Sequence, residues 1–314
     1  MNKICILGGL GHIGSGLTQY LTRKYPDMEI TVVDNLSTLK NHSLLGIASR
    51  IKSFVEIDVR DPQIFNVLQN QDLVLHLAAM TRAYNNFDLK NLSEHNLGST
   101  RSVLKFCEQL KIPIIFVSSS KVFDDHEGDV TETTIVRQPE NLYAKTKLEE
   151  ESIVLSYEKG FVLRLGTIYG ISPGMQFHTM MNRFCWNAIN SFPIPIWSNS
   201  LNSNSPLLYL NHLIRVFEKL FLDTISLKDF RILHCVSENI SPLDVFYKIK
   251  KVFPDSTYDV LEVPFATRSK SLNMLSSYNY QNEYEGDSIP NYLENVKDLY
   301  TSDHFNWSTF YKSL

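Results

Sequence analysis

The sequence predicts an α/β protein with a doubly wound parallel sheet and a smaller second lobe. Short apolar runs of strand length alternate with longer stretches of helical period through the first half of the chain. Because this alternation is typical of successive β-α-β units, the strands are expected to lie parallel in one sheet. A cluster of glycines directly after the first apolar run marks a tight turn from strand to helix. After about Gly170 the alternation weakens and turn-forming residues increase.

The glycine cluster predicts a nucleotide-binding turn. Gly8, Gly11 and Gly14 stand at regular spacing between the apolar run 4–7 and a helical pattern. Glycine permits a sharp turn and close approach of the backbone to a pyrophosphate, and the following helix N-terminus offers N–H groups and partial positive charge. The second strand ends in Asp34, where a carboxylate would accept hydrogen bonds from ribose hydroxyls and repel a 2′-phosphate. We therefore predict a Rossmann-type domain that binds NAD rather than NADP.

Six strands with intervening helices are expected before Gly170. The strands are expected over 4–7, 30–33, 53–57, 72–77, 113–117 and 161–165, and helices after Gly14, from Pro62, over 92–110 and over 141–157. Residues 124–139 are acidic and polar without a period, so we expect a loop over the carboxyl edge of the sheet. Asn96 is mildly unfavourable inside a helix, so it should either face solvent or hold a backbone group in the core.

The second half of the chain has a different rhythm. A turn-rich break over 170–174 precedes a helical segment over 176–189, a Pro-, Ser- and Asn-rich segment over 192–206, an alternating and then helical segment over 207–222, a strand-like segment over 231–236 and a helical one over 242–252. We interpret residues 1–170 as the dinucleotide-binding domain. Residues 171–314 are interpreted as mainly a substrate-binding lobe, partly interleaved with the first. The aromatic tail 300–314 is expected to pack on this lobe.

Composition excludes several classes of function. Charged residues make up 20% of the 314 residues, the formal net charge is −4, and no basic block occurs, so nothing indicates a nucleic-acid partner or binding to an anionic membrane surface. The four cysteines lie far apart without a C-x-x-C pair, which argues against a disulfide framework or a metal site. No apolar run reaches membrane-spanning length, and a first strand at residue 3 leaves no room for a signal peptide. We expect a soluble cytoplasmic protein.

Tyr143 and Lys147 form a candidate catalytic pair. Their Y-x-x-x-K spacing places both side chains on one face of a helix. A phenol with a pKa of about 10 would need that pKa lowered by roughly 3 units to act as a base near neutral pH, and a neighbouring ammonium favours the phenolate. The same spacing occurs at Tyr20/Lys24 and Tyr247/Lys251, but only Tyr143 opens the helix that follows a strand ending in serines.

These candidates converge on one edge of the predicted sheet. Gly8, Asp34, Asp58, Ala78 and Ser119 each follow the end of a predicted strand. In open parallel sheets, ligands bind beyond the carboxyl ends of the strands. The convergence therefore predicts the site more strongly than any single motif.

Several segments resemble those of the extended short-chain dehydrogenase/reductases, and within them the NAD-dependent nucleotide-sugar epimerase/dehydratase group. GGLGHIG is similar to that group's GGxGxIG, Asp34 to its ribose-binding acid, Asp58-Val59 to its adenine contact, HLAA (76–79) to its cofactor wall, NLGST (96–100) to N-x-x-G-T, SSSKVF (118–123) to S-S-x-x-V-Y-G and RLGTIYG (164–170) to R-x-x-N-x-Y-G. The register of Val122-Phe123 against V-Y makes Ser119 the catalytic serine, with Ser120 the less favoured choice. The resemblance is most specific over 3–170.

The resemblance implies a hydride mechanism with NAD as cofactor and a nucleotide-sugar or related sugar as substrate. Tyr143 would take the proton of a sugar hydroxyl, Ser119 would hold the oxygen, and Lys147 would bind the nicotinamide ribose. Implied cofactor contacts are Gly8, Gly11, His12, Ile13, Gly14, Asp34, Asn35, Asp58, Val59, Leu77, Ala78, Ala79 and Lys147. Candidate substrate contacts are Thr81, Ser120, Thr167, His178, Arg183 and Arg268. A homodimer through the two helices that carry Asn96 and Tyr143 is also implied.

Departures from the family pattern limit the reaction that can be predicted. Lys121 stands where dehydratases carry an acidic residue, so no Asp-Glu pair follows Ser119 and a 4,6-dehydratase is disfavoured. The arginine that holds a substrate diphosphate in relatives is replaced by the segment Ser205-Pro206-Leu207, and Asn211-His212 replaces an acidic pair. Arg183, Arg268 and Lys270 could supply the missing charge, or they could be solvated surface residues. Thr167 replaces a sugar-binding asparagine, and Phe123 replaces a tyrosine.

Three hypotheses about the function therefore remain. The first is an NAD-dependent sugar epimerase, in which the transferred hydride returns to the substrate and the cofactor is regenerated. The second is an NAD(P)H-dependent 4-keto-sugar reductase on the same scaffold. The third is a non-catalytic dinucleotide-binding sensor, which the altered diphosphate segment supports and the intact Ser119, Tyr143 and Lys147 oppose.

Overall fold

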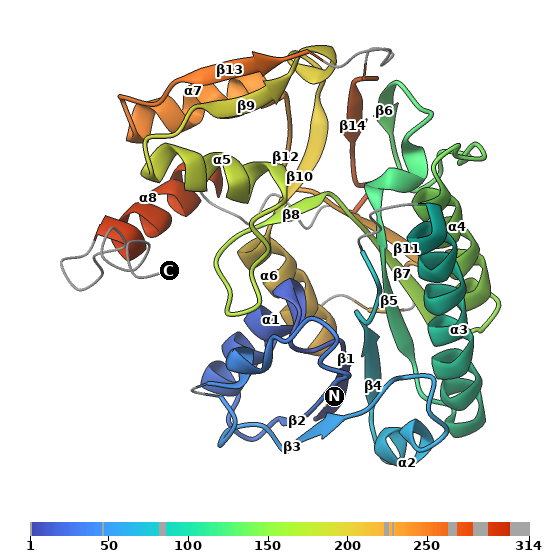
Figure 1. The fold of residues 1–314 in the computed structure, drawn as a ribbon. Helices are drawn as coiled ribbons and strands as arrows, with labels where there is room; N and C mark the ends of the chain where they lie inside the picture. The colour runs from blue at the N-terminus through green and yellow to red at the C-terminus, as the bar shows by residue number, and fades with distance from the viewer. Residues whose placement is uncertain are drawn as a thin grey trace.

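A seven-stranded parallel sheet forms the centre of the protein (Figure 1). The computed structural model describes residues 2–45, 47–81, 86–222, 226–227, 229–262, 269–278 and 288–301. Across the sheet the strands are β11 (Ile232–Cys235), β7 (Gly160–Leu165), β5 (Ile114–Ser119), β4 (Leu73–His76), β1 (Lys3–Leu7), β2 (Glu29–Asp34) and β3 (Ser53–Glu56). The predicted doubly wound α/β class is confirmed, and the six strands expected before Gly170 are all present.

Helices cover both faces of this sheet (Figure 1). They are α1 (His12–Lys24), α2 (Ile64–Leu68), α3 (Asn86–Leu110), α4 (Leu142–Leu155) and α6 (Leu210–Phe221). Side chains along β1 alternate between two core clusters: Ile4 and Ile6 pack with α1 and α6, whereas Cys5 and Leu7 pack with α2, α3 and α4. All four side chains are fully buried, as the two-residue period of a strand covered on both faces requires.

The C-terminal lobe is built from small sheets and three helices. Its elements in the described part of the chain are β8 (Thr167–Tyr169), α5 (Met180–Ile189), β9 (Ile194–Trp197), β10 (Ser205–Tyr209), β12 (Glu238–Ile240), α7 (Pro242–Val252), β13 (Tyr258–Leu261), β14 (Leu272–Met274) and α8 (Ser288–Thr301). Most of them share a core of their own, whereas Leu272 and Met274 of β14 pack with Val122, Phe123 and Val130. Short 3₁₀ helices η1 (Asn41–Leu44), η2 (Ser120–Phe123) and η3 (Ser198–Ser200) lie in the connections.

The two parts of the chain interleave. The strand-like segment expected over 231–236 becomes β11 and joins the central sheet beside β7, and α6 packs against α1. In the other direction, β6 (Gly128–Val130) pairs with β14 of the second half. The expected interleaving is therefore present, while the division at residue 170 stays a prediction. None of the helices in the described part of the chain is long and apolar enough to cross a lipid bilayer.

Two local expectations were wrong in detail. Residues 124–139, expected as loop, contain β6, and the segment 192–206, for which no strand was predicted, contains β9. Both strands are short and exist through pairing with β14 and β13, respectively, so local periodicity could not reveal them. The helix expected from residue 176 begins only at Met180. The aromatic tail after Thr301 lies outside the described residues.

The structure shows which of the two roles expected for Asn96 applies: it holds a backbone group in the core. Its side chain is fully buried inside α3, where Oδ1 accepts a hydrogen bond from the Met80 N–H at 2.8 Å and Nδ2 donates to the Met80 carbonyl at 3.0 Å. The asparagine therefore satisfies both backbone groups of a residue that follows β4. Because an unsatisfied buried backbone group is costly, this pairing fixes the chain at the carboxyl edge of the sheet.

Candidate active site

The predicted site residues meet at the carboxyl edge of the central sheet. Leu7, at the end of β1, lies opposite both Val33 of β2 and His76 of β4, and His76 lies opposite Phe116 of β5. The Leu77 N–H donates to the Leu7 carbonyl at 2.9 Å, which extends the pairing one residue past the end of β4. The segments after β1, β2, β4 and β5 therefore leave the sheet side by side.

The glycine turn after β1 fits the pyrophosphate of a dinucleotide. Gly8 has φ +78°, and a Cβ added there would lie 2.6 Å from the Ala78 backbone nitrogen. A Cβ on Gly14 would lie 2.6 Å from Gly9 Cα, so the helix packs directly on the turn. Gly11 caps α1 without a side-chain hydrogen bond, no acidic residue lies in the first turn, and a Cβ on Gly11 would have only the Gly8 carbonyl oxygen within 4 Å. The helix N-terminus is thus left open for an anion.

The replacement Gly8→Ala tests this close approach. An L-residue at φ +78° costs about 1–3 kcal/mol by itself, and the clash with Ala78 adds to that cost. We expect a loss of stability larger than that of Gly128→Ala, because Gly128 also has a positive φ of +88° but no atom within 4 Å of an added Cβ. Thermal unfolding and NAD affinity measure both effects. Equal stability of the two variants would contradict the proposed packing of the turn.

Asp34 contacts the turn after β1 with one carboxylate oxygen and the turn after β2 with the other. Oδ2 accepts a hydrogen bond from the Leu10 N–H at 3.1 Å, and Oδ1 accepts one from the Leu36 N–H at 3.0 Å. Each carboxylate oxygen can accept a further hydrogen bond, so the ribose contact predicted for Asp34 remains chemically possible. Asp34 therefore links the turn after β1 to the turn after β2, a structural task that the sequence did not reveal.

Asp58 contacts Asn35, the residue that follows Asp34. Its carboxylate forms a bidentate pair with Arg60 at 2.7 and 2.8 Å and accepts a hydrogen bond from Asn35 Nδ2 at 3.1 Å. The hydrogen bonds from the Arg60 guanidinium hold the pKa of Asp58 well below its usual range. Val59 beside it is buried. Asp58 thus remains ionised and fixed at the position predicted for an adenine contact.

His12 points into the protein rather than toward open space. The ring is buried, and Nε2 lies 2.8 Å from the Gly170 carbonyl oxygen at the end of β8. Burial lowers its pKa to about 4, so the ring is neutral near pH 7 and donates that hydrogen bond. Ile13 is half-buried against the core. The side chain of His12 thus ties the glycine turn to the residue that follows β8, so the cofactor contact predicted for His12 would have to come from its backbone.

Ser119, Tyr143 and Lys147 come from adjoining elements. Ser119 is the last residue of β5, and its Oγ accepts a hydrogen bond from the Lys121 N–H at 3.2 Å. Asn141 caps α4, its Oδ1 accepting a hydrogen bond from the Tyr143 N–H at 2.8 Å, so the helix begins beside the half-buried Tyr143. Lys147 follows one turn later and is buried. Because α4 packs against β5 and η2, the helix presents this pair next to the end of β5.

Two buried glutamates behind this pair were missed at the level of sequence. Glu150 Oε2 lies 3.1 Å from Lys147 Nζ, and Glu151 forms a bidentate pair with Arg164 of β7 and accepts a hydrogen bond from the Ser118 hydroxyl at 2.5 Å. In the sequence both belong to the run Glu149-Glu150-Glu151, which reads as a solvated helix face. The i+3 spacing of Glu150 from Lys147 was the available signal.

The candidate substrate residues are scattered more widely. Ser120 is buried, whereas Ser119 beside it is partly exposed, which favours Ser119 as the residue that a substrate can reach. Thr81, His178 and Arg183 are exposed, and Thr167 is half-buried in β8. Arg268 lies outside the described residues. No cluster of His, Cys, Asp and Glu side chains in the described ranges has the arrangement of a metal site.

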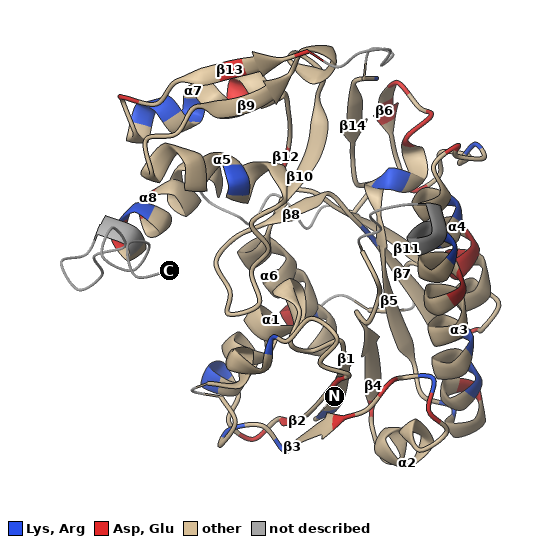
Figure 2. Cartoon of the chain, in the orientation of Figure 1, with Lys and Arg blue, Asp and Glu red and all other residues tan. Residues whose placement is uncertain are grey.

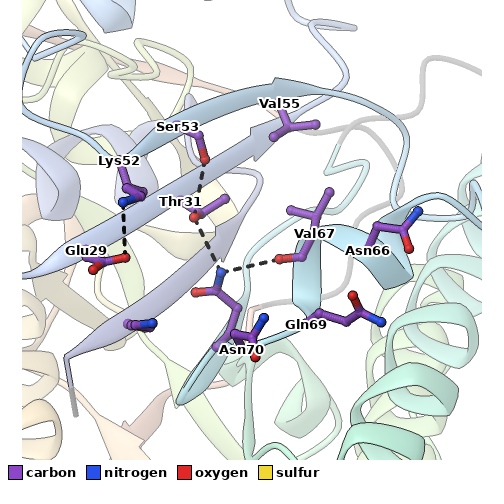
Figure 3. Close-up of a pocket in the computed structure, with 11 residues that line it drawn as sticks. Glu29, Thr31, Lys52, Ser53, Val55, Asn66, Val67, Gln69 and Asn70 are labelled. Carbon is purple, nitrogen blue, oxygen red and sulfur yellow. Dashed lines mark hydrogen bonds and ion pairs between the residues drawn. The ribbon is translucent and has the colours of Figure 1, made fainter.

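A separate hollow of about 380 Å³ lies at the opposite end of the sheet, where β1, β2 and β3 begin (Figure 3). It is lined by polar side chains that already interact, among them Lys52 with Glu29 at 3.6 Å and the Ser53 hydroxyl with Thr31 at 3.4 Å. None of the predicted catalytic or cofactor residues lines it. This hollow is therefore not part of the candidate active site.

Several proteins of known function are similar to this chain in sequence. The chain is 28% identical over 241 residues to a dTDP-D-glucose 4,6-dehydratase of Dictyostelium discoideum, covering 69% of this chain and 55% of that protein. It is 28% identical over 285 residues to a trifunctional UDP-glucose 4,6-dehydratase/UDP-4-keto-6-deoxy-D-glucose 3,5-epimerase/UDP-4-keto-L-rhamnose-reductase of Arabidopsis thaliana, covering 83% of this chain and 41% of that one. The chain thus spans about half the length of the curated relatives it matches.

A solved structure gives the same fold over nearly the whole chain. The UDP-glucuronic acid 4-epimerase of Bacillus cereus, in complex with UDP-glucuronic acid and NAD, superposes with a TM-score of 0.79 at 22% identity, covering 95% of this chain and 100% of that one. At this identity the likeness concerns the fold. The model of the NAD dependent epimerase/dehydratase family matches residues 4–223, which is more than half of the 314 residues. The chain therefore belongs to the NAD-dependent epimerase/dehydratase family, whose members are enzymes of the extended short-chain dehydrogenase/reductase type with NAD as cofactor.

Proposed function

We propose that the chain is an NAD-dependent epimerase that acts on a nucleotide-sugar, with Tyr143 as the base. The observation that carries this proposal is the placement of Tyr143 and Lys147 on one face of α4, beside the end of β5 where Ser119 lies. The open glycine turn after β1 lies along the same edge of the sheet. A poised phenol, a hydroxyl and an ammonium at one edge are the parts that proton transfer from a sugar hydroxyl needs.

Each residue has a distinct task in this proposal. The Ser119 hydroxyl donates a hydrogen bond to the sugar oxygen and orients it, while the Tyr143 oxygen takes the proton from that oxygen. Lys147 binds the ribose next to the nicotinamide and its positive charge stabilises the phenolate. NAD, when bound, would accept the hydride of the sugar carbon and return it to the opposite face of that carbon. Tyr143 gives the proton back to the oxygen as the hydride returns, and the net change is the configuration at one carbon.

The residues after Ser119 support an epimerase over a dehydratase. Elimination of water across a sugar needs an acid and a base in addition to Tyr143, and the positions that follow hold Ser120 and Lys121. Ser120 is buried, and the Lys121 ammonium forms an ion pair with Asp124 at 3.2 Å. Neither side chain is a carboxylic acid that could protonate the departing hydroxyl group.

The alternatives differ in how they would handle the cofactor. A 4-keto-sugar reductase would use NAD(P)H as a spent substrate, and a sensor would bind the dinucleotide without turnover. The altered diphosphate segment is compatible with both alternatives. Ser205 and Leu207 pair with Ile240 and Glu238 in the second lobe, and the segment Ser205-Pro206-Leu207 offers no cation to a substrate diphosphate. The Tyr143 phenol one turn before Lys147 on α4 favours an enzyme, because a sensor that only binds the dinucleotide does not need a group that moves protons.

The content of NAD in the protein as purified tests the proposal. An epimerase regenerates its cofactor in every cycle and is expected to retain about one NAD per chain, which extraction and absorbance measure. Turnover of UDP- or dTDP-linked hexoses without added cofactor should follow. Protein that is empty and oxidises added NADH or NADPH with a keto-sugar would favour the reductase. Failure to bind any dinucleotide would contradict the function of the glycine turn.

We also propose that two copies associate through α3 and α4. The outward side of these helices carries charges of both signs, among them the exposed pair Arg101–Glu149 at 2.7 Å (Figure 2). Charged pairs of this kind could exchange partners between two copies of the chain. Light scattering at low and high salt would detect the dimer and its dependence on charge.

A further inference from the structure

Glu150 is a buried carboxylate that the proposed reaction does not use. Its side chain is fully buried on α4, three residues after Lys147, whose side chain is 4% exposed. Oε2 lies 3.1 Å from Lys147 Nζ, and Oε1 accepts a hydrogen bond from the Thr100 hydroxyl of α3 at 2.7 Å. Within the described residues no hydrogen bond reaches Oε2, so the ammonium of Lys147 is what balances the charge there.

A neutral histidine contacts Thr100, the residue whose hydroxyl donates a hydrogen bond to Glu150. His76 Nε2, on β4, lies 3.3 Å from the Thr100 Oγ1. Because Thr100 gives its only proton to Glu150, His76 must be the donor in this contact. Burial, with a smaller contribution from the Lys147 charge, lowers the pKa of His76 to about 3. The chain His76–Thr100–Glu150 therefore brings no positive charge, and Lys147 is the cation that faces the carboxylate.

Several other charged groups on and around α4 are paired with one another. In the part of the chain that the structure describes, the elements packed against α4 contribute these pairs: Arg164 of β7 with Glu151, Lys121 of η2 with Asp124 directly after it, and Arg101 of α3 with Glu149. His95 of α3 lies 3.7 Å from Asp58, and burial lowers its pKa. Lys147 also faces β5, because its Nζ lies 4.6 Å from the centroid of the Phe116 ring.

Tyr143, Lys147 and Glu150 follow one another along one helix face. The spacings of four and three residues place the ammonium about one turn and the carboxylate about two turns from the tyrosine, roughly 10 Å along the axis for the latter. A nearby ammonium favours the phenolate, and a carboxylate behind it opposes that effect. The two charges therefore act on Tyr143 with opposite sign and unequal strength.

We propose that Glu150 is a positioning residue that fixes the Lys147 ammonium and offsets part of its charge, so that Glu150 sets the pH range in which Tyr143 acts as a base. This inference rests on the function proposed above. In this proposal the Glu150 carboxylate determines both where the Lys147 ammonium lies and how strongly that ammonium stabilises the Tyr143 phenolate. An enzyme with this device would work at a higher pH than one in which Lys147 is unopposed.

Titration of Tyr143 in the NAD-saturated protein tests the proposal. The ultraviolet absorbance of tyrosinate is followed against pH in the wild type, Glu150→Gln and Glu150→Asp, and the step that Tyr143→Phe lacks belongs to Tyr143. Removing a charge at roughly 10 Å in a partly buried setting should lower the midpoint by about one pH unit in Glu150→Gln. Glu150→Asp keeps the charge but withdraws it by one methylene, so a smaller shift in the same direction is expected.

Glu149→Gln is the matched control. It removes the same charge from the adjacent position, but that carboxylate is exposed and paired with Arg101, so the midpoint should not move. A midpoint that is unchanged or higher in Glu150→Gln overturns the proposal. If that variant does not fold, an unchanged midpoint in Glu150→Asp does the same. If wild type and Tyr143→Phe titrate alike, the role of Tyr143 itself fails and this inference fails with it; a normal wild-type step without a shift defeats the inference alone.

Discussion

The replacement Tyr143→Phe is expected to lower the turnover of a nucleotide-sugar by about 10²–10⁴-fold, the range typical of a lost general base. Phenylalanine keeps the ring that packs at the start of α4 and removes only the hydroxyl. Tyr143 is half-buried, and its backbone N–H, rather than its side chain, takes part in the cap with Asn141. The effect should therefore fall on chemistry, with the helix and the cofactor turn intact. Formation of the epimer from UDP- and dTDP-linked hexoses measures it.

Two controls separate chemistry from binding in this experiment. The NAD content and the melting temperature of Tyr143→Phe should equal those of the wild type, because the glycine turn and Asp34 lie on other elements. Tyr247→Phe removes a phenol that has the same Y-x-x-x-K spacing but is 53% exposed on α7, and it should leave turnover unchanged. Full activity in Tyr143→Phe would show that a different group moves the proton.

The central sheet could be predicted because its signals are local. Each strand is an apolar run between turn residues, and full burial of Ile4, Cys5, Ile6 and Leu7 on two alternating faces is what an uninterrupted apolar run predicts. The parallel arrangement follows from the alternation with helices. The segment 231–236 shows the limit: its strand character was evident, but its place beside β7 depends on contacts with residues about 70 positions earlier.

The same difference between local and distant signals explains which parts of the candidate site could be predicted. Glycines, Asp34 and the Tyr143–Lys147 spacing could be read because each follows from a backbone rule or a helix period. The hydrogen bonds of Glu150 with Thr100 and of Asp34 with the Leu10 N–H could not be read, because each joins a side chain to an element that is distant in sequence. His12 illustrates the difference: its position in the motif was evident, but its inward hydrogen bond to Gly170 spans 158 residues.

Breaking the buried pair of Glu151 and Arg164 should have the largest effect on stability. The side chains are 2% and 4% exposed, with Arg164 Nη2 2.8 Å from Glu151 Oε2 and Nε 3.0 Å from Oε1. Glu151→Gln would leave the guanidinium buried without a countercharge, and removing one partner of such a pair costs about 3–5 kcal/mol. The melting temperature should therefore fall by roughly 5–8 °C for a protein of this size.

The neighbouring residue provides the comparison that tests this explanation. Glu149→Gln breaks a pair whose side chains are 51% and 58% exposed, so its cost should be at most about 1 kcal/mol. The double replacement Glu151→Leu with Arg164→Met removes both charges and should recover more than half of the stability lost in Glu151→Gln, because apolar side chains of similar volume can replace a buried ion pair at little cost. If the double variant is less stable than Glu151→Gln, the ion pair itself, rather than the isolated charge of Arg164, must stabilise the contact between α4 and β7.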